Sequence, residues 1–126
     1  MTEEALLLSA RRGAVLWLTI NRPDVHNAMN STLVRALGAA VLQAAEDEAV
    51  RVIVLTGAGD RAFTAGADIR EIAGFGPAEM KHYNRRWLDL YRAIELCPKP
   101  VIASVHGWAT GGGAVEIGRA SCRERV

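Results

Sequence analysis

The sequence predicts an α/β fold. Three apolar runs rich in β-branched residues, at 15–20, 50–56 and 101–105, alternate with two segments of helical periodicity, at 31–47 and 78–96. This alternation is typical of strands in one sheet joined by crossover helices. Half of the residues are hydrophobic and 23% are charged, which is enough apolar material for a packed core and argues against disorder. At 126 residues, the chain is one domain or part of one.

The first strand and helix follow from composition and spacing. Val15–Ile20 is β-rich and stops at the turn-forming run Asn21–Asp24, after which a loop is expected through Ala28. Residues 31–47 are expected to form a helix, with Asn30 or Ser31 supplying the N-cap oxygen. The helix would bury one apolar face, made of Leu33, Val34, Leu37, Ala40, Val41, Ala44 and Ala45.

The second half continues the alternation. Val50–Thr56 is a nearly continuous β-branched run, the pattern of a strand buried on both faces. Residues 63–68 are expected to be a loop of small residues, followed by a short helical turn at 69–72. Pro77 suits the first position of the next helix, which Pro98 and Pro100 close. Val101–Val105 is the third strand, and a helix start is expected at Ala114 after the glycine-rich run.

Charge and cysteine content restrict the partners and the compartment. The first 115 residues carry 12 basic and 12 acidic side chains, so there is no basic stripe and no nucleic-acid partner is expected. Cys97 and Cys122 form no CxxC or CxxH pattern, so neither a metal site nor a disulfide framework is expected. Glu3 and Glu4 stand where a secretory signal would be basic, and no apolar stretch is long enough to span a membrane. A cytoplasmic protein is the simplest expectation.

Two loops of small residues are candidates for chemistry. Ala65–Asp68 and Gly111–Gly113 each follow a strand-like run and precede a helical start. Such positions leave backbone N–H groups without internal partners, and two of these donors converging on one point would stabilise an oxyanion. Tight turns that serve only packing would produce the same pattern, so spacing alone leaves both interpretations open.

The motifs resemble those of a known family. In order along the chain they are Asn21-Arg22-Pro23 with Asn27-Ala28-Met29, then Phe63–Ile69, then Lys99–Ala103 with His106–Gly113. This ordered set, from about Val15 to Gly113, resembles the enoyl-CoA hydratase/isomerase (crotonase) family. The resemblance implies a crotonase-like spiral of ββα units, truncated, in which residues 1–115 are the N-terminal part of the domain.

The resemblance also implies roles for particular residues. The backbone N–H groups of Ala67 and Gly112 would form the oxyanion hole for a thioester carbonyl. Residues expected to contact the substrate or its coenzyme A are Asp24, Val25, His26, Ala65, Asp68, Ile69 and Arg70. Coenzyme A would be part of the acyl-CoA substrate, and neither a metal nor another cofactor is expected. The whole protein would be a homotrimer or a dimer of trimers.

The reaction first expected is that of an enoyl-CoA hydratase, a lyase that adds water across a 2,3-double bond in fatty-acid or related acyl-CoA breakdown. Val115 departs from this pattern, because hydratases of the family place a Glu there. Glu116 lies one place later, which on a helix turns its side chain by about 100°. The second carboxylate of the family would lie after residue 126, so this fragment itself is expected to be inactive. The alternatives are an enoyl-CoA isomerase or other chemistry of the family, or a non-catalytic acyl-CoA-binding subunit.

Residues 116–126 depart from the family and resemble the translation of a sequencing-library adapter. They are expected to be a non-native tail rather than a native polar terminus, and they are left out of the fold. The 126-residue chain is expected to fold poorly, because its third strand and glycine loop would lack covering elements.

Three other features have less specific explanations. Gly57–Ala62 fits the G-x-G-x-x-G/A dinucleotide fingerprint, but Phe63–Gly66 is a poor start for the helix that this fingerprint requires. Glu71 could face an acyl pocket, although a solvated helix face is the favoured location. The aromatic stripe of Tyr83, Trp87 and Tyr91 is expected in the core or at a subunit contact.

Overall fold

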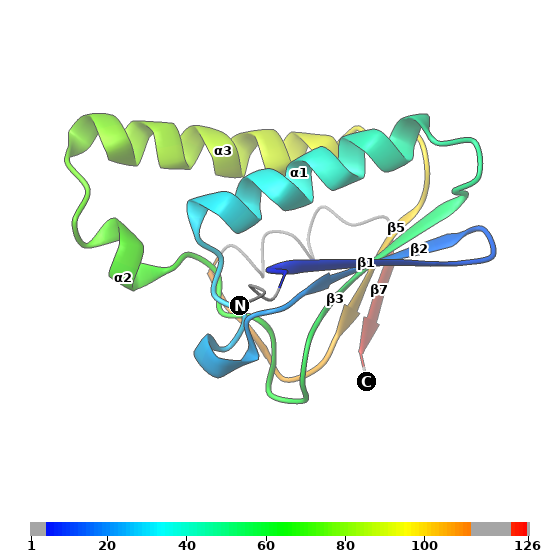
Figure 1. Cartoon of the computed structure of the whole chain (residues 1–126), viewed down its shortest axis with the longest axis horizontal. Coiled ribbons are helices and arrows are strands. Elements are labelled where there is room, and N and C mark those ends of the chain that lie inside the picture. Colours follow the sequence, from blue (N-terminus) through cyan, green and yellow to red (C-terminus); the bar gives the residue numbers. More distant parts are fainter. Residues whose placement is uncertain (1–4, 112–121, 126) are drawn as a thin grey trace.

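The computed structural model describes residues 5–111 and 122–125. Two long helices, α1 (Ser31–Glu46) and α3 (Pro77–Glu95), lie side by side and cover one face of a twisted sheet (Figure 1). The short helix α2 (Ile69–Ile72) precedes α3, and a 3₁₀ helix, η1 (Pro23–Val25), follows the second strand. The α/β class expected from the sequence is therefore confirmed.

The main sheet has five strands in the order β1-β2-β3-β5-β7. Neighbouring strands from β2 to β7 run parallel, and β1 pairs antiparallel with β2 at one edge. The strands are β1 (Leu7–Arg12), β2 (Val15–Ile20), β3 (Val52–Gly57), β5 (Val101–Val105) and β7 (Cys122–Arg125). The bounds expected for β2 and β5 are confirmed, and β3 begins two residues later than expected.

The first two strands form a hairpin that the sequence did not predict. Arg12 pairs with Val15, so Gly13 and Ala14 make the turn. Gly13 has a φ of +60°, a backbone conformation that glycine adopts without a steric cost. β1 was missed because its side chains are almost all exposed, which leaves no alternating apolar pattern to recognise.

A second, smaller sheet pairs β4 (Ala62–Thr64) with β6 (Trp108–Ala109) in parallel. The expectation that residue 63 begins a loop is wrong, because Ala62, Phe63 and Thr64 form a fully buried strand. The chain thus runs β1-β2-α1, then β3-β4-α2-α3, then β5-β6. Two ββα units and the start of a third are present, as the resemblance implied.

The core lies between the main sheet and the two long helices. Its largest fully buried side chains are Leu18, Ile20, Met29, Leu33, Leu37, Ile53, Leu55, Phe63, Leu90 and Ile94. The apolar face expected on α1 is confirmed, with Ala40 and Ala45 at its half-buried margin. The Asn30 side chain caps this helix by accepting a hydrogen bond from the Leu33 N–H at 2.9 Å. Pro77 starts α3 at its first position, as expected.

The sequence analysis left residues 116–126 out of the fold, whereas residues 122–125 form strand β7. This strand pairs in parallel with β5, and Ile102 lies opposite Cys122. Whether residues 116–126 are native stays a prediction. Among the residues that the structure describes, no helix is long and apolar enough to cross a membrane, and no three metal-ligating side chains cluster.

Candidate active site

A β-bridge between two segments distant in the sequence orients the backbone at Ala67. Met29 and Ala67 form an isolated parallel β-bridge, in which the Met29 N–H donates to the Gly66 carbonyl at 2.7 Å. The Asp68 N–H donates to the Met29 carbonyl at 3.2 Å. Because backbone groups of successive extended residues point to opposite sides, the N–H of Ala67 points away from Met29. Within residues 5–111 and 122–125, this N–H has no hydrogen-bond partner.

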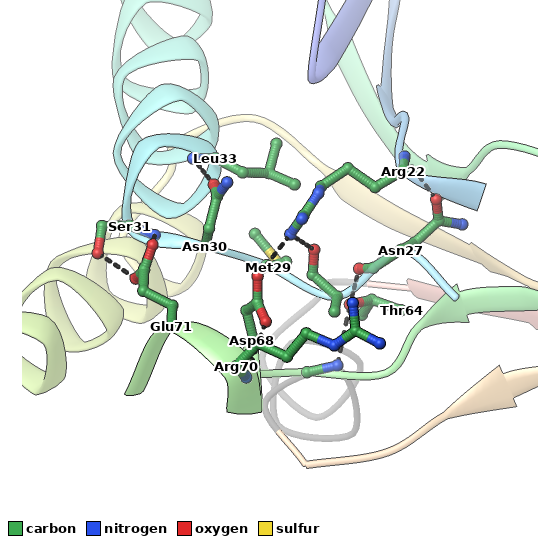
Figure 2. A network of polar contacts seen from close by, with 12 residues as sticks. Arg22, Asn27, Met29, Asn30, Ser31, Leu33, Thr64, Asp68, Arg70 and Glu71 are labelled. Carbon is green, nitrogen blue, oxygen red and sulfur yellow. Dashed lines mark hydrogen bonds and ion pairs between the residues drawn. The ribbon is translucent and has the colours of Figure 1, made fainter. Parts of the chain in front are cut away.

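Asn27 fixes the segment that carries Met29. Its buried side chain accepts a hydrogen bond from the Arg22 N–H at 2.9 Å and donates to the carbonyls of Ala58 and Ala62 at 3.0 and 2.8 Å. The Thr64 hydroxyl donates to the Asn27 carbonyl at 2.7 Å and accepts from the Gly66 N–H at 3.1 Å. Asn27 therefore links η1, the end of β3 and β4 to the turn before Ala67. Figure 2 shows Asn27 between Arg22 and Thr64, with its hydrogen bond from the Arg22 N–H dashed.

Asp68 is held on the other side of Ala67. Its carboxylate caps α2 through the Arg70 N–H at 3.1 Å and forms an ion pair with Arg22, whose Nη1 is 3.0 Å away. The same Arg22 nitrogen donates to the Ala28 carbonyl at 2.8 Å. Figure 2 shows the Arg22 side chain reaching toward Asp68. Burial alone would raise the pKa of Asp68, but the hydrogen bond and charge of Arg22 and two backbone N–H groups bring it below its ordinary value.

Glu71 is half-buried and does not line the groove along α3. Its carboxylate accepts hydrogen bonds from the backbone N–H and the hydroxyl of Ser31, the first residue of α1. The side chain is thus only partly solvated, because it caps α1 rather than lying free on the helix face that was favoured from the sequence. A carboxylate at a helix N-terminus satisfies an unpaired N–H and interacts favourably with the helix dipole. Figure 2 shows this contact beside the Asn30 cap.

An open groove begins at Ala67 and runs along α3. It has a volume of about 470 Å³ and is lined by Ala67, Met80, Tyr83, Asn84, Trp87, Leu88 and Tyr91. Tyr83 and Trp87 meet edge to face, and Trp87 packs against Tyr91 with a tilt of 42°. The expected aromatic stripe is thus part of the core at Tyr83 and Trp87 and also forms the wall of this groove. Its wall is mainly apolar and aromatic, and Ala67 lies at one end of its lining.

The second small-residue loop lies against the first. The Thr110 N–H donates to the Thr64 carbonyl at 3.2 Å, and the Thr110 hydroxyl donates to the Ala65 carbonyl at 3.1 Å. Gly111 has a φ of +54°, and a Cβ there would lie 3.7 Å from the Ala65 carbonyl oxygen. The structure therefore brings the two candidate loops together as far as residue 111. Gly112, Val115 and Glu116 lie outside the described residues.

The remaining candidate residues fall into two adjacent segments. Asp24 and Val25 lie on η1, and the His26 carbonyl accepts from the Ala65 N–H at 3.0 Å. Ile69 is 69% exposed at the start of α2, and Arg70 is also exposed. The structure thus joins the segment with residues 24–26 to the segment with residues 65–70. The sequence analysis missed Arg22, Asn27, Thr64 and Tyr83 as residues that position this site, although the first three belong to the recognised motifs.

The structure does not support a dinucleotide-binding role for Gly57–Ala62. Gly57 ends β3, and the residues after Gly59 continue into strand β4 rather than into a helix. A dinucleotide fingerprint needs a helix N-terminus at that point to bind the pyrophosphate.

The fold and site define a class of protein: an α/β spiral of ββα units in which a free backbone donor lies beside an apolar groove. A family profile described as enoyl-CoA hydratase/isomerase matches residues 10–117, and the chain belongs to that family.

Named relatives agree with this assignment. The short-chain-enoyl-CoA hydratase of Clostridium acetobutylicum is 39% identical over 116 residues, which are 92% of this chain and 44% of that protein. The crotonyl-CoA hydratase of Syntrophomonas wolfei is 38% identical over 111 residues, covering 88% and 42%. The chain therefore spans less than half the length of these two relatives.

Solved structures share the fold. The enoyl-CoA hydratase structure from Mycobacterium smegmatis has a TM-score of 0.92 and 38% identity, and the match covers 97% of this chain and 48% of that one. An enoyl-CoA hydratase/carnithine racemase from Magnetospirillum magneticum has a TM-score of 0.91 and 32% identity, covering 98% and 47%. The crotonase-like spiral implied by the sequence motifs is confirmed.

Proposed function

We propose that the whole protein binds an acyl-CoA and polarises its thioester carbonyl, and that its reaction is the hydration of a 2-enoyl-CoA. The observation that carries this proposal is the Ala67 N–H, which lacks a partner among the described residues and lies at the head of the groove along α3. The names of the relatives, which are hydratases of short-chain enoyl and crotonyl thioesters, support the choice of reaction.

In this proposal the carbonyl oxygen of the thioester accepts a hydrogen bond from the Ala67 N–H, and the backbone N–H of Gly112 supplies the second one. When the oxygen of water bonds to C3, the water gives up one proton to a base of the whole protein. The electron pair of the C2–C3 double bond then forms a C1–C2 double bond, and the carbonyl pair moves onto the thioester oxygen. The resulting enolate takes a proton back at C2, which restores the carbonyl. A donor already aimed at the oxygen stabilises this charge without reorganisation, and each such donor is worth about 3 kcal/mol. The acyl chain would lie along the aromatic wall formed by Tyr83, Trp87 and Tyr91.

Coenzyme A would contact the joined segments. Asp24, Val25 and His26 would meet its nucleotide and pantetheine part, while Ala65, Asp68, Ile69 and Arg70 would line the stretch next to the thioester. The exposed Arg70 is a cation suited to a phosphate group. Since Asp68 is engaged with Arg22, we propose that it serves by shaping this stretch. The proposal also includes a cytoplasmic homotrimer or dimer of trimers without a further cofactor.

A second candidate reaction is favoured by Val115. Hydration requires a carboxylate within hydrogen-bond reach of the water, and an apolar residue stands at the position where hydratases of the family have Glu. An isomerase would use the same carbonyl polarisation and move a proton between two carbons of the acyl chain. A non-catalytic subunit would bind acyl-CoA and convert nothing.

The test uses the purified whole protein with crotonyl-CoA, followed by loss of the enoyl-thioester absorbance. Ala67→Pro removes the N–H without breaking a hydrogen bond of the described residues, and a fall in kcat of about 10²–10³ is expected. Ala78→Pro, at the second position of α3 where an N–H has no helical partner, is the matched control and should keep its activity. Full turnover by the Ala67→Pro variant would overturn the proposal. Binding of crotonyl-CoA without turnover by the unaltered protein would instead support the isomerase or the non-catalytic subunit, which conversion of a 3-enoyl-CoA would distinguish.

A further inference from the structure

We infer that the hydroxyl of Tyr83 is a positioning group for the Ala67 N–H, acting through the Met29 carbonyl. This inference rests on the proposed function, because it assigns a role in aiming the same donor. Tyr83 lies on α3, far along the chain from both Met29 and Ala67, and it connects the wall of the groove to the backbone at its head.

The contact is short and buried. The Tyr83 hydroxyl donates to the Met29 carbonyl oxygen at 2.7 Å, and the side chain is 3% exposed. The same oxygen accepts the Asp68 N–H at 3.2 Å, which is the longer bond of the bridge around Ala67. A carbonyl oxygen has two lone pairs, so both donors can be satisfied at once. Tyr83 therefore fixes the oxygen to which the residue after Ala67 is bound.

The ring itself has little freedom to move. Phe75 and Trp87 both pack against this ring edge to face, with ring centroids 5.7 Å and 6.3 Å from that of Tyr83. These ring contacts restrict the position of the hydroxyl relative to the Met29 carbonyl. The bridge consists of one residue on each segment, so the Met29 carbonyl orients the Ala67 peptide together with the ion pair between Arg22 and Asp68.

The geometry distinguishes the hydroxyl from the ring. The ring fills the core and forms part of the groove wall, roles that phenylalanine would also fulfil. The hydroxyl adds the bond to Met29 and polar interactions with the Trp87 indole and the Asp68 N–H, so its removal tests these polar contacts and not the packing of the ring. A small change in the direction of the Ala67 N–H would weaken its hydrogen bond to the developing oxyanion more than it weakens ground-state binding.

The experiment compares Tyr83→Phe with the unaltered whole protein, using crotonyl-CoA turnover and the absorption of bound cinnamoyl-CoA. The cinnamoyl absorption shifts to longer wavelength when its carbonyl is polarised, so it reports the donor without requiring turnover. We expect kcat to fall about tenfold, KM to stay within about twofold and the red shift to shrink.

Thr56→Val is the matched control, because it also removes a hydroxyl that donates to a backbone carbonyl, that of Ser104 at 3.1 Å in the main sheet. It should leave both the red shift and kcat unchanged. A Tyr83→Phe protein with the kcat and red shift of the unaltered protein, whatever its melting temperature, would overturn the inference.

The Ala67→Pro variant separates the two proposals. If it loses the red shift while Tyr83→Phe keeps it, the carbonyl site stands and the role of Tyr83 is wrong. If Ala67→Pro keeps both the shift and its turnover, the proposed function itself is wrong, and the role assigned to Tyr83 falls with it.

Discussion

Arg22 and Asp68 form an ion pair, with Nη1 and Oδ2 3.0 Å apart, between the segment before Met29 and the segment after Ala67. Both side chains are largely buried, with exposed fractions of 20% and 16%. The pair therefore acts as a second link across the Met29–Ala67 bridge, in addition to the backbone bonds.

Asp68→Asn should lower the free energy of unfolding by about 1–2 kcal/mol at pH 7, because it removes the charge that pairs with Arg22. Since the folded-state pKa of Asp68 is lower than its ordinary value of 3.8, this stabilisation is fully present above about pH 4. It is lost as the pH falls through the folded-state pKa. Urea unfolding of both proteins between pH 7 and pH 2 should show the two stabilities converging at the acid end.

The control for this pair is Asp89→Asn. Its carboxylate is 3.7 Å from Arg85, and both side chains are at least half exposed, so a change below about 0.5 kcal/mol is expected at any pH. A stability gap for Asp68→Asn that stays constant from pH 7 to pH 2 would contradict the assignment of the effect to this ion pair.

Asn27→Ala should be among the most damaging substitutions near the site. It leaves the carbonyls of Ala58 and Ala62 and the Arg22 N–H without the partners they have now, and it places alanine at a φ of 58°. A loss of about 3 kcal/mol is expected in urea unfolding. Asn21→Ala removes one exposed hydrogen bond, to Ala5, and should cost less than about 0.5 kcal/mol. Equal stability of the two variants would show that the Asn27 side chain does not hold this loop.

Gly57→Ala should prevent the end of β3 from packing on β4. A Cβ there would lie 2.2 Å from the Phe63 carbonyl oxygen and 2.5 Å from that of Ala62, and both are backbone atoms that cannot move aside cheaply. We expect a loss of about 3 kcal/mol or more, measured as melting temperature and soluble yield. Gly13→Ala is the comparison, because nothing lies within 4 Å of its Cβ position and only the positive φ opposes it, at about 1 kcal/mol. Equal melting temperatures for the Gly57→Ala and Gly13→Ala proteins would disprove the close approach of Gly57 to the carbonyls of Ala62 and Phe63.

Glu71→Gln should destabilise the start of α1 by about 1 kcal/mol at low salt, because the carboxylate that binds the Ser31 N–H and hydroxyl loses its charge. The difference should shrink at high salt, which screens the interaction with the helix end. Urea unfolding at two salt concentrations measures this, with the exposed residue Glu48 changed to Gln as the control. A loss that is the same for both glutamates would mean that Glu71 does not cap α1.

The sequence predicted the elements whose periodicity is strong. The apolar face of α1, the proline at the start of α3 and the buried run of β3 carry their own signals in spacing and composition. β1 lacked such a signal because its side chains are exposed and its stability comes from pairing with β2. β4 has only three residues, too few for a period-2 pattern to be recognised.

The candidate site was predictable as two glycine- and alanine-rich loops and as a set of family motifs. The structure adds the contacts that hold the first loop. Met29 pairs with Ala67, the Asn27 side chain binds the Ala62 carbonyl, and the Tyr83 hydroxyl binds the Met29 carbonyl. These contacts join residues that are distant in the sequence through backbone carbonyls, which carry no residue identity. No pattern of residue types could therefore have predicted which carbonyl Tyr83 would reach.

The hairpin of β1 and β2 has a consequence for the order of folding. Within residues 5–111 and 122–125, it is the one pair of main-sheet strands that closes through a tight turn, whereas the parallel pairs β2–β3 and β3–β5 need α1 or the α2–α3 stretch in place between them. Hairpins close within microseconds, while pairings between distant segments wait for long loops to close. We therefore expect the edge of the sheet to form early and to serve as the template on which β3 and then β5 align.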